Sequence, residues 1–261
     1  GMQVTAIFDF GIANQGLSTG FESLLYVNGH PYQAVDINHQ EVNFEELAGQ
    51  EVELTFLLWT GLERGGEPQT LYHHIKQADI GYLHEQTDEF YYLSLCISEE
   101  LKYLTEEDEN RFGVISALDS AYRMINWDAD KFYSTMGPAL THLKGRLADM
   151  KKNTGITINC IGHTHIDVAY MWRYKHTREK AMRSFSTVTK LMKEFEEYSF
   201  LQTQPQLYKY LKEDSPELYG RIQELVKQGR WEPDGGMWLE ADCNLSSGEA
   251  LVRQFLYGVR F

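Results

Sequence analysis

Two histidines and an aspartate lie within the short segment INCIGHTHIDVAYMW, residues 158–172. His165 and Asp167 are two positions apart, so in an extended chain their side chains point to the same side. A neutral imidazole and a carboxylate that converge in this way suit a divalent metal such as zinc. His163 shares that face, and we expect it to be a third ligand or a group that holds a ligand in place through a hydrogen bond.

The same spacing also occurs without a metal, as polar residues of a surface turn or as a buried histidine with its hydrogen bonds satisfied. Here the three residues follow an apolar run and precede Tyr170 and Trp172, which favours a functional site at the end of a strand. Two classes of metal-dependent hydrolase remain open from these residues alone. Amidohydrolase barrels place a His-x-His pair at the end of their first strand, and His163 and His165 fit that pattern as well.

The elements that must position these residues belong to the third of three regions. Residues 1–86 are rich in β-branched and aromatic residues and contain an Asn28-Gly29 hairpin signal, which predicts an antiparallel β-sandwich. Residues 87–152 show apolar positions at spacings of three and four and predict a helical region, with Asp88 as an N-cap and a break near Gly137-Pro138. The fold class is therefore α/β and multidomain.

Residues 153–261 alternate between short apolar runs and long amphipathic stretches. Residues 156–161 predict a fully buried strand, and helices are expected at about 177–198 and from about 205 to 228, with Gly229 ending the second. Short strands are expected near 199–204 and 230–240, and Ser247 should open a last helix. This order is typical of parallel β/α units and predicts the first units of a β/α barrel.

The last helix shows no stop signal. Its apolar stripe, which includes Leu251, Phe255 and Val259, continues to Phe261, and three β/α units cannot close a barrel. We therefore expect the chain to be an N-terminal fragment of a longer protein. An apolar stripe left uncovered in this way also favours self-association, so a homo-oligomer is possible.

Composition narrows the range of partners. A formal net charge of −14 argues against nucleic acid and against an anionic membrane surface, both of which need clustered basic residues. No apolar run approaches the roughly 20 residues of a spanning helix, and the N-terminus has no basic region followed by an apolar one. Gly1 before Met2 is interpreted as the residue left by tag cleavage. The cysteines are few and far apart, which favours reduced thiols in the cytoplasm: Cys96, Cys160 and Cys243.

Longer motifs decide between the two hydrolase classes. The segments GHTHIDVAYMW, RSF at 183–185, SPELYGRIQELVKQ and GRWEPDGGMWLEADCNLSSGEALVRQFLYG at 229–258 together resemble the α-mannosidases of glycoside hydrolase family 38, of the bacterial or cytosolic type. The resemblance runs from about residue 156 to residue 261. It implies a retaining enzyme that hydrolyses terminal α-linked mannose from oligosaccharides or glycans, on a β/α barrel with one zinc ion.

The resemblance also implies roles for single residues. The family's His-x-Asp zinc ligands fall on His165 and Asp167, which leaves His163 as a supporting group. The aromatic residue that lies under the sugar falls on Tyr170, where many members have tryptophan. The nucleophile, which is also a zinc ligand, and the acid/base carboxylate are expected beyond Phe261, so the 261 residues alone should be inactive.

Further substrate contacts are expected from the segment GGMWLEADCN. Trp238 and Asp242 are candidates for binding the α-mannoside, and Glu240 lies between them. The alternatives are a core position for Trp238 and a helix-capping role for the carboxylates. In the turn VDINHQEV, the polar residues Asp36, Asn38 and His39 either reach the substrate cleft or stabilise the turn. A non-catalytic carbohydrate-binding protein is the competing hypothesis from another class.

Overall fold

The computed structural model describes residues 3–11, 22–44, 47, 49–59, 74–150, 155–170 and 172–261. These residues form two compact units. The first unit contains Gly1–Thr5, Asn43–Glu45 and Ile80–Ile158, and the second contains Ala6–Val42, Glu46–Asp79 and Asn159–Phe261. Parts of the predicted first region, residues 12–21 and 60–73 among them, lie outside the described residues.

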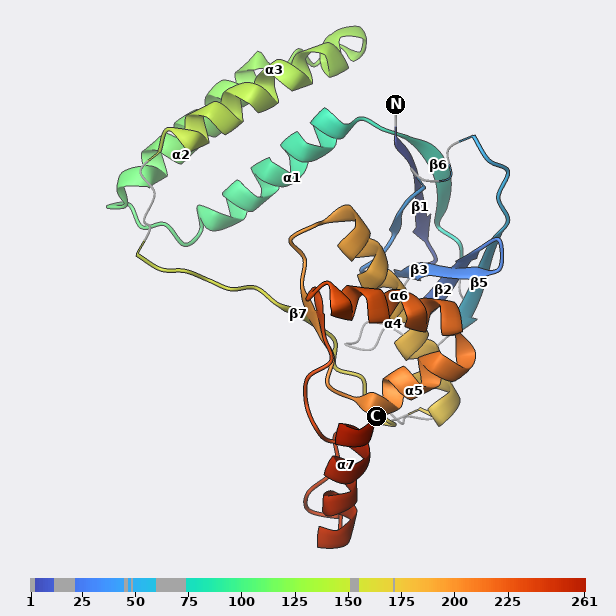
Figure 1. Cartoon of the computed structure of the whole chain (residues 1–261). Coiled ribbons are helices and arrows are strands. Elements are labelled where there is room, and N and C mark those ends of the chain that lie inside the picture. The colour runs from blue at the N-terminus through green and yellow to red at the C-terminus, as the bar shows by residue number, and fades with distance from the viewer. Residues whose placement is uncertain are drawn as a thin grey trace. The chain divides into compact units, whose positions relative to one another are not determined.

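Three helices make up most of the first unit and pack side by side (Figure 1). They are α1 (Glu85–Glu100), α2 (Glu109–Met124) and α3 (Ala129–Ala148). Their shared core contains apolar residues from all three, including Phe90, Ala117 and Leu143. The helical character that the sequence predicts for residues 87–152 is therefore found in three separate helices.

Two details of this helical unit differ from the prediction. Asp88 is not an N-cap, because His84 occupies that position and its side chain accepts a hydrogen bond from the Thr87 amide. Helix α3 does not break at Pro138, although proline removes one backbone hydrogen bond. Met136 and Leu140 on either side of it are buried in the core of the three helices, and this packing holds the helix together.

The strands of the first region form two small three-stranded sheets. One has the order β4-β1-β6, with β1 (Gln3–Asp9), β4 (Glu41–Asn43) and β6 (Gln77–Leu83). The other has the order β3-β2-β5, with β2 (Glu22–Val27), β3 (His30–Asp36) and β5 (Leu54–Trp59), and both of its pairings are antiparallel. Asn28 and Gly29 have positive φ angles of 51° and 81°, which confirms the predicted hairpin turn.

The third region contains a parallel sheet of the order β7-β8-β9. Its strands are β7 (Gly162–His163), β8 (Phe200–Leu201) and β9 (Trp231–Glu232), and they align Gly162 with Phe200 and Phe200 with Trp231. Helix α4 (Tyr174–Glu194) joins β7 to β8, α5 (Pro205–Asp214) and α6 (Pro216–Lys227) join β8 to β9, and α7 (Gly248–Arg260) follows β9 (Figure 1). The predicted parallel β/α units are confirmed over these residues.

The predicted buried strand at residues 156–161 is wrong. Residues 156–161 have no strand hydrogen bonding, and Ile156, Ile158 and Ile161 expose 78%, 80% and 64% of their surfaces. Pairing with β8 begins only at Gly162. An apolar β-branched run becomes a buried strand only where neighbouring elements cover it, and composition does not show whether they do.

Two helix boundaries also differ from the prediction. The helix expected at 177–198 spans Tyr174–Glu194, and the helix expected to reach Gln228 is two helices, because Ser215 precedes Pro216 and leaves the helical conformation. Gly229 follows α6 with a φ of 70°, as expected of a glycine that ends a helix. No helix in the described part of the chain is long and apolar enough to cross a membrane.

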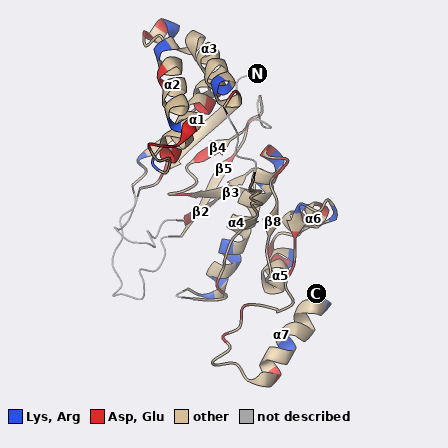
Figure 2. Ribbon diagram, turned by 90° about the vertical axis from the view of Figure 1, so that its left-hand side faces the viewer, with Lys and Arg blue, Asp and Glu red and all other residues tan. Residues whose placement is uncertain are grey.

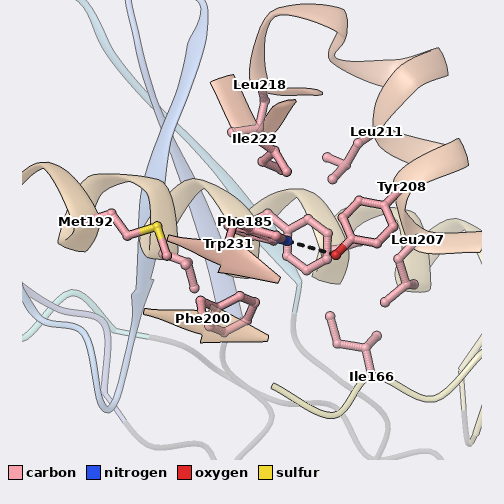
Figure 3. Close-up of a cluster of buried hydrophobic side chains, with 12 residues drawn as sticks. Ile166, Phe185, Met192, Phe200, Leu207, Tyr208, Leu211, Leu218, Ile222 and Trp231 are labelled. Carbon is pink, nitrogen blue, oxygen red and sulfur yellow. Dashed lines mark hydrogen bonds between the residues drawn. The ribbon is translucent and has the colours of Figure 1, made fainter. Parts of the chain in front are cut away.

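An aromatic core lies beneath the parallel sheet (Figure 3). Trp231 of β9 is 1% exposed, and its ring centroid lies 4.6 Å from that of Phe200 on β8 and 5.2 Å from that of Phe185 on α4. Its indole Nε1 donates a 2.8 Å hydrogen bond to the Tyr208 hydroxyl of α5. The core therefore fixes strands β8 and β9 and helices α4 and α5 to one another.

Candidate functional site

The polar segment after β7 is held through its backbone carbonyl groups. The Gln202 side chain donates a 2.8 Å hydrogen bond to the Thr164 carbonyl, and the Gln204 side chain donates one of 3.0 Å to the Ile166 carbonyl. Both glutamines are buried, with exposures of 0% and 2%. Ile166 is itself buried in the aromatic core, so every second residue of the segment is anchored and the residues between them point outward.

One of the glutamines that hold this segment, Gln202, is itself hydrogen-bonded to the aromatic core. The Tyr208 hydroxyl, which accepts from Trp231, donates a 2.7 Å hydrogen bond to the Gln202 carbonyl. Each of these buried polar groups therefore has a partner, as a rigid polar network requires. The backbone that carries His165 and Asp167 is set by the same residues that close the core.

His165 lies between two carboxylates. Its Nε2 is 3.1 Å from Asp167 Oδ1, and its Nδ1 is 3.0 Å from Glu240 Oε2, which comes from the loop after β9. The hydrogen bond with Asp167, together with the negative charge of Glu240, raises the pKa of His165. All three side chains are about half exposed, so a ligand can reach them.

The pair His165 and Asp167 fits one part of a zinc site. Two ligand atoms of a tetrahedral zinc ion, each about 2.0–2.2 Å from the metal, lie about 3.4 Å apart, close to the 3.1 Å found here. Glu240 contacts the opposite ring nitrogen, where it would orient the imidazole and not share the ion. Within the described residues, no group of three or more His, Cys, Asp or Glu side chains could hold a metal. In the part of the chain that the structure describes, the cluster consists of one imidazole with a carboxylate at each of its ring nitrogens.

His163 lies on the strand and not in the carboxylate cluster. Its Nδ1 is 2.9 Å from the Leu201 carbonyl of β8. Together with His165 it lines a pocket of about 380 Å³, whose wall also includes Asp36 at the end of β3 and His39 from the turn that follows. The structure thus brings this turn to the same pocket as the two histidines. Asn38 is not among the residues that line it.

Tyr170 is 64% exposed, and its ring packs edge-on against Trp172, with 5.8 Å between the ring centroids. An exposed aromatic ring three residues after Asp167 is available for stacking on a sugar. Trp172 is partly buried, and its Nε1 donates a 2.9 Å hydrogen bond to the Thr177 hydroxyl. That hydroxyl donates in turn to the Asp167 carbonyl, at 3.3 Å, so the tryptophan is tied to the backbone of the site.

Trp238 and Asp242 make their contacts elsewhere. Trp238 donates a 2.8 Å hydrogen bond to Gln206 at the start of α5, and its ring packs edge-on against Phe261 after α7. Asp242 Oδ1 accepts from the Asn244 amide at 2.8 Å, and its carbonyl accepts from Ser246, so it stabilises the turn that leads into α7. Trp238 is therefore a partly buried packing residue, whereas Asp242 belongs to the turn before α7 and does not cap that helix, whose N-cap is Ser247.

The residues that sequence reasoning missed are those that support the site. Gln202, Gln204 and Thr177 hold the backbone of residues 164–167 but have no chemistry that marks them as functional. A signal was present in the segment SFLQTQ, where two glutamines alternate at the end of an apolar strand. Alternation of this kind places both amides on the same side of a strand, next to its neighbour.

The chain is similar to known glycosyl hydrolases over the residues that contain this cluster. Residues 155–261 match the family model described as Glycosyl hydrolases family 38 N-terminal domain. The chain is 31% identical to Alpha-mannosidase 2C1 of Mus musculus over 261 residues, 92% of this chain and 24% of the mouse protein. It is 50% identical to Alpha-mannosidase G of Dictyostelium discoideum over 101 residues, and 43% identical to Alpha-mannosidase of Saccharomyces cerevisiae over 102 residues.

The last two matches each cover 39% of this chain and 9% of the relative. The chain therefore spans a quarter or less of the length of these relatives. The matched residues contain the parallel strands and the His165, Asp167 and Glu240 cluster, so the similarity falls on the site itself. These matches place residues 155–261 in the N-terminal domain of glycosyl hydrolase family 38.

Proposed function

We propose that this chain is the metal-binding part of an α-mannosidase, in which His165 and Asp167 are two of the ligands of one zinc ion. The whole protein would hydrolyse terminal α-linked mannose from oligosaccharides or glycans with retention of configuration. The observation that carries the proposal is the 3.1 Å approach of His165 Nε2 to Asp167 Oδ1, with Glu240 on the other ring nitrogen. The family match and the names of the relatives support the substrate class.

Each residue of the cluster has a separate role in this proposal. Glu240 accepts a hydrogen bond from His165 Nδ1–H, which fixes the tautomer and leaves the Nε2 lone pair for the metal. Asp167 supplies an anionic oxygen next to that lone pair. Tyr170 offers its exposed ring to the apolar face of the sugar. When bound, the zinc ion supplies Lewis acidity and a fixed point against which sugar hydroxyl groups are oriented.

Retention also requires a nucleophilic carboxylate and an acid/base carboxylate about 5–5.5 Å apart. We propose that both follow Phe261 and that the parallel strands β7, β8 and β9 are the first strands of a β/α barrel. Three parallel strands with connecting helices support this architecture. His163 is proposed as a supporting residue, because its ring lies beside Leu201 and lines the pocket that His165 also lines.

The two alternatives receive less support. An amidohydrolase would use His163 and His165 as a ligand pair, whereas the carboxylates of Asp167 and Glu240 are the groups that approach His165. A non-catalytic carbohydrate-binding protein would not need parallel β/α units. The three free cysteines favour a reducing compartment, and we propose a cytoplasmic location.

The test uses the full-length protein and a nitrophenyl α-mannoside as substrate. We expect zinc-dependent release of nitrophenol, about one zinc ion for each chain, and loss of both in His165→Ala and Asp167→Ala, since a site that loses one ligand loses most of its affinity. His74→Ala, which changes an exposed histidine elsewhere in the chain, is the control and should retain both. Full zinc content in both site variants would refute the assignment of the ligands.

Two milder variants test the supporting roles. Glu240→Gln and His163→Ala should each weaken zinc binding or activity by roughly 10–100-fold, as expected of groups that orient a ligand without contacting the metal. Sugar binding without turnover by a folded, zinc-loaded protein would favour the carbohydrate-binding alternative.

A further inference from the structure

The ammonium group of Lys180, on the first turns of α4, is enclosed by one carboxylate and two tryptophans. Its Nζ lies 2.7 and 2.6 Å from the two oxygens of Glu22. It also lies 4.6 Å from the ring centroid of Trp59 and 4.7 Å from that of Trp172. The Lys180 side chain is only 14% exposed. A cation that is paired, largely buried and placed over two indole rings is held far more firmly than a surface lysine.

Trp172 connects Lys180 to the backbone of Asp167. Its Nε1 donates to the Thr177 hydroxyl at 2.9 Å, and that hydroxyl donates to the Asp167 carbonyl at 3.3 Å. Thr177 is fully buried, so its hydroxyl has little freedom to find other partners. Trp172 also packs against Tyr170, the proposed platform for the sugar. A continuous path of contacts therefore joins Lys180 to both a proposed metal ligand and a proposed sugar contact.

The other partners of Lys180 come from the antiparallel sheet. Glu22 begins β2 and Trp59 ends β5, and the two residues lie directly opposite each other in the β2-β5 ladder. One register of this sheet therefore presents both the carboxylate and the ring that hold the ammonium. Both residues lie outside residues 155–261, which match the family domain.

The same sheet is attached to α4 at a further point. The Thr187 hydroxyl accepts a 2.9 Å hydrogen bond from the Ala34 amide of β3. Arg183, also on α4 and only 6% exposed, forms an ion pair with Glu22. Figure 2 shows basic residues along α4. Burial lowers the pKa of Lys180, while the charge of Glu22 and the hydrogen bond to it raise that pKa.

We propose that Lys180 is a positioning residue: held by Glu22 and Trp59 of the antiparallel sheet, it fixes Trp172 and through it the segment 164–172 that carries Asp167 and Tyr170. The antiparallel sheet then acts as a part of the site's support and not as a separate module. The consequence for catalysis rests on the function proposed above, whereas the consequence for the mobility of residues 164–172 does not.

The test compares Lys180→Met, Lys180→Arg and Lys190→Met in the full-length protein. Lys190 is a matched control on the same helix, because its side chain is 15% exposed, pairs with Glu194 at 3.2 Å and lies 4.4 Å from the Tyr32 ring centroid. The first readout is amide hydrogen exchange of peptides that cover residues 164–173. We expect exchange there to be about 10-fold faster in Lys180→Met, unchanged in Lys190→Met and largely restored in Lys180→Arg.

The second readout is the hydrolysis of a nitrophenyl α-mannoside. We expect kcat/KM of Lys180→Met to fall about 10–100-fold, with recovery in Lys180→Arg and no change in Lys190→Met. If Lys180→Met does not fold, Trp59→Leu is used instead, because it removes one of the two rings that contact the Lys180 ammonium. This variant should also speed up amide exchange of residues 164–173, by a smaller factor. Equal exchange of residues 164–173 in Lys180→Met and Lys190→Met would overturn the proposal. If the protein has no mannosidase activity, the hydrogen-exchange result still tests whether Lys180 positions residues 164–172. The positioning role and the proposed mannosidase activity can therefore be refuted independently of each other.

Discussion

His39 and Asp36 form a contact at the pocket wall whose strength depends on pH. His39 Nδ1 lies 2.8 Å from Asp36 Oδ1, which also accepts from the Asn38 amide at 2.8 Å. The hydrogen bond to Asp36 raises the pKa of His39 above 6.5. Burial by itself would raise the pKa of Asp36, but the hydrogen bond from His39 is among the effects that bring it below 3.8.

The two shifts define the pH window in which the pair stabilises the fold. A raised histidine pKa contributes stability that is fully present below the unfolded-state pKa and is lost as pH rises through the folded-state value. A lowered aspartate pKa contributes stability that is present above the unfolded-state value and is lost as pH falls through the folded one. The pair therefore stabilises the folded state most between about pH 3.8 and pH 6.5, the ordinary pKa values of the two side chains.

We expect Asp36→Asn to move the NMR titration midpoint of His39 down toward 6.5, because it removes the charge that favours the imidazolium. The loss of stability in this variant should be larger at about pH 5.5 than at about pH 8.5. Asp130→Asn, at an exposed position in the first turn of α3, is the control. An unchanged His39 midpoint in Asp36→Asn would show that the contact does not form in solution.

A second prediction at the residue scale concerns the buried hydroxyl of Tyr208. It accepts from Trp231 Nε1 and donates to the Gln202 carbonyl, so Tyr208→Phe leaves two buried groups without their partner. We expect a loss of about 1–3 kcal/mol in the free energy of unfolding of the second unit. Tyr174→Phe, at a ring that is 65% exposed, should change it by less than about 0.5 kcal/mol. Equal stabilities of the two variants in urea would contradict the network.

At the scale of elements, strand β7 is confined by a close approach of Tyr198. A Cβ added to Gly162 would overlap the phenol of Tyr198, whose Cζ would lie 2.7 Å from it. A side chain at Gly162, where β7 starts to pair with β8, would therefore require the Tyr198 ring to move.

We expect Gly162→Ala to destabilise the second unit by about 1–3 kcal/mol, as overpacking of a filled site does. The double variant Gly162→Ala with Tyr198→Ala should lose less than the sum of the two single variants, because the overlap is gone. Gly220→Ala is the control, since nothing lies within 4 Å of an added Cβ there, and in the interior of α6 alanine should stabilise by about 0.5–1 kcal/mol. Additive losses in the double variant would show that Tyr198 does not set the strand.

At the scale of the whole molecule, the site of this chain contains only part of what the proposed reaction needs. His165 and Asp167 are the two ligands that we propose, whereas a zinc site takes four groups. The last helix presents apolar residues to solvent, with Phe255 and Val259 exposing 54% and 77% of their surfaces. The chain covers 9% and 24% of the length of two of its relatives.

We expect the purified 261-residue chain to hydrolyse no α-mannoside at any zinc concentration and to bind zinc orders of magnitude more weakly than the full-length protein. Nitrophenyl α-mannoside turnover and calorimetric zinc titration measure the two effects. An Asp167→Ala variant of the same chain excludes contaminating activity. Turnover by the chain that this variant abolishes would place the nucleophile within these residues, with the carboxylates of Glu240 and Asp242 as the first to test.

Local sequence was sufficient where a few neighbouring residues decide the outcome. The Asn28-Gly29 turn, the glycine after α6 and the Ser247 cap, whose side chain accepts from the Ala250 amide, are all found as predicted. Each depends on backbone conformations and hydrogen bonds within about four residues. The alternation of strands and helices over residues 162–260 and the two-residue spacing of His165 and Asp167 were readable for the same reason.

Tertiary structure decided everything that depends on distant partners. Residues 156–161 have the composition of a buried strand but are largely exposed, while Glu240 reaches His165 from 75 positions further along the chain. Lys180 is one of several basic residues on α4, and only the β2-β5 register makes it an enclosed cation. Burial and pairing are properties of the contacts that two segments make together, so neither segment alone contains them.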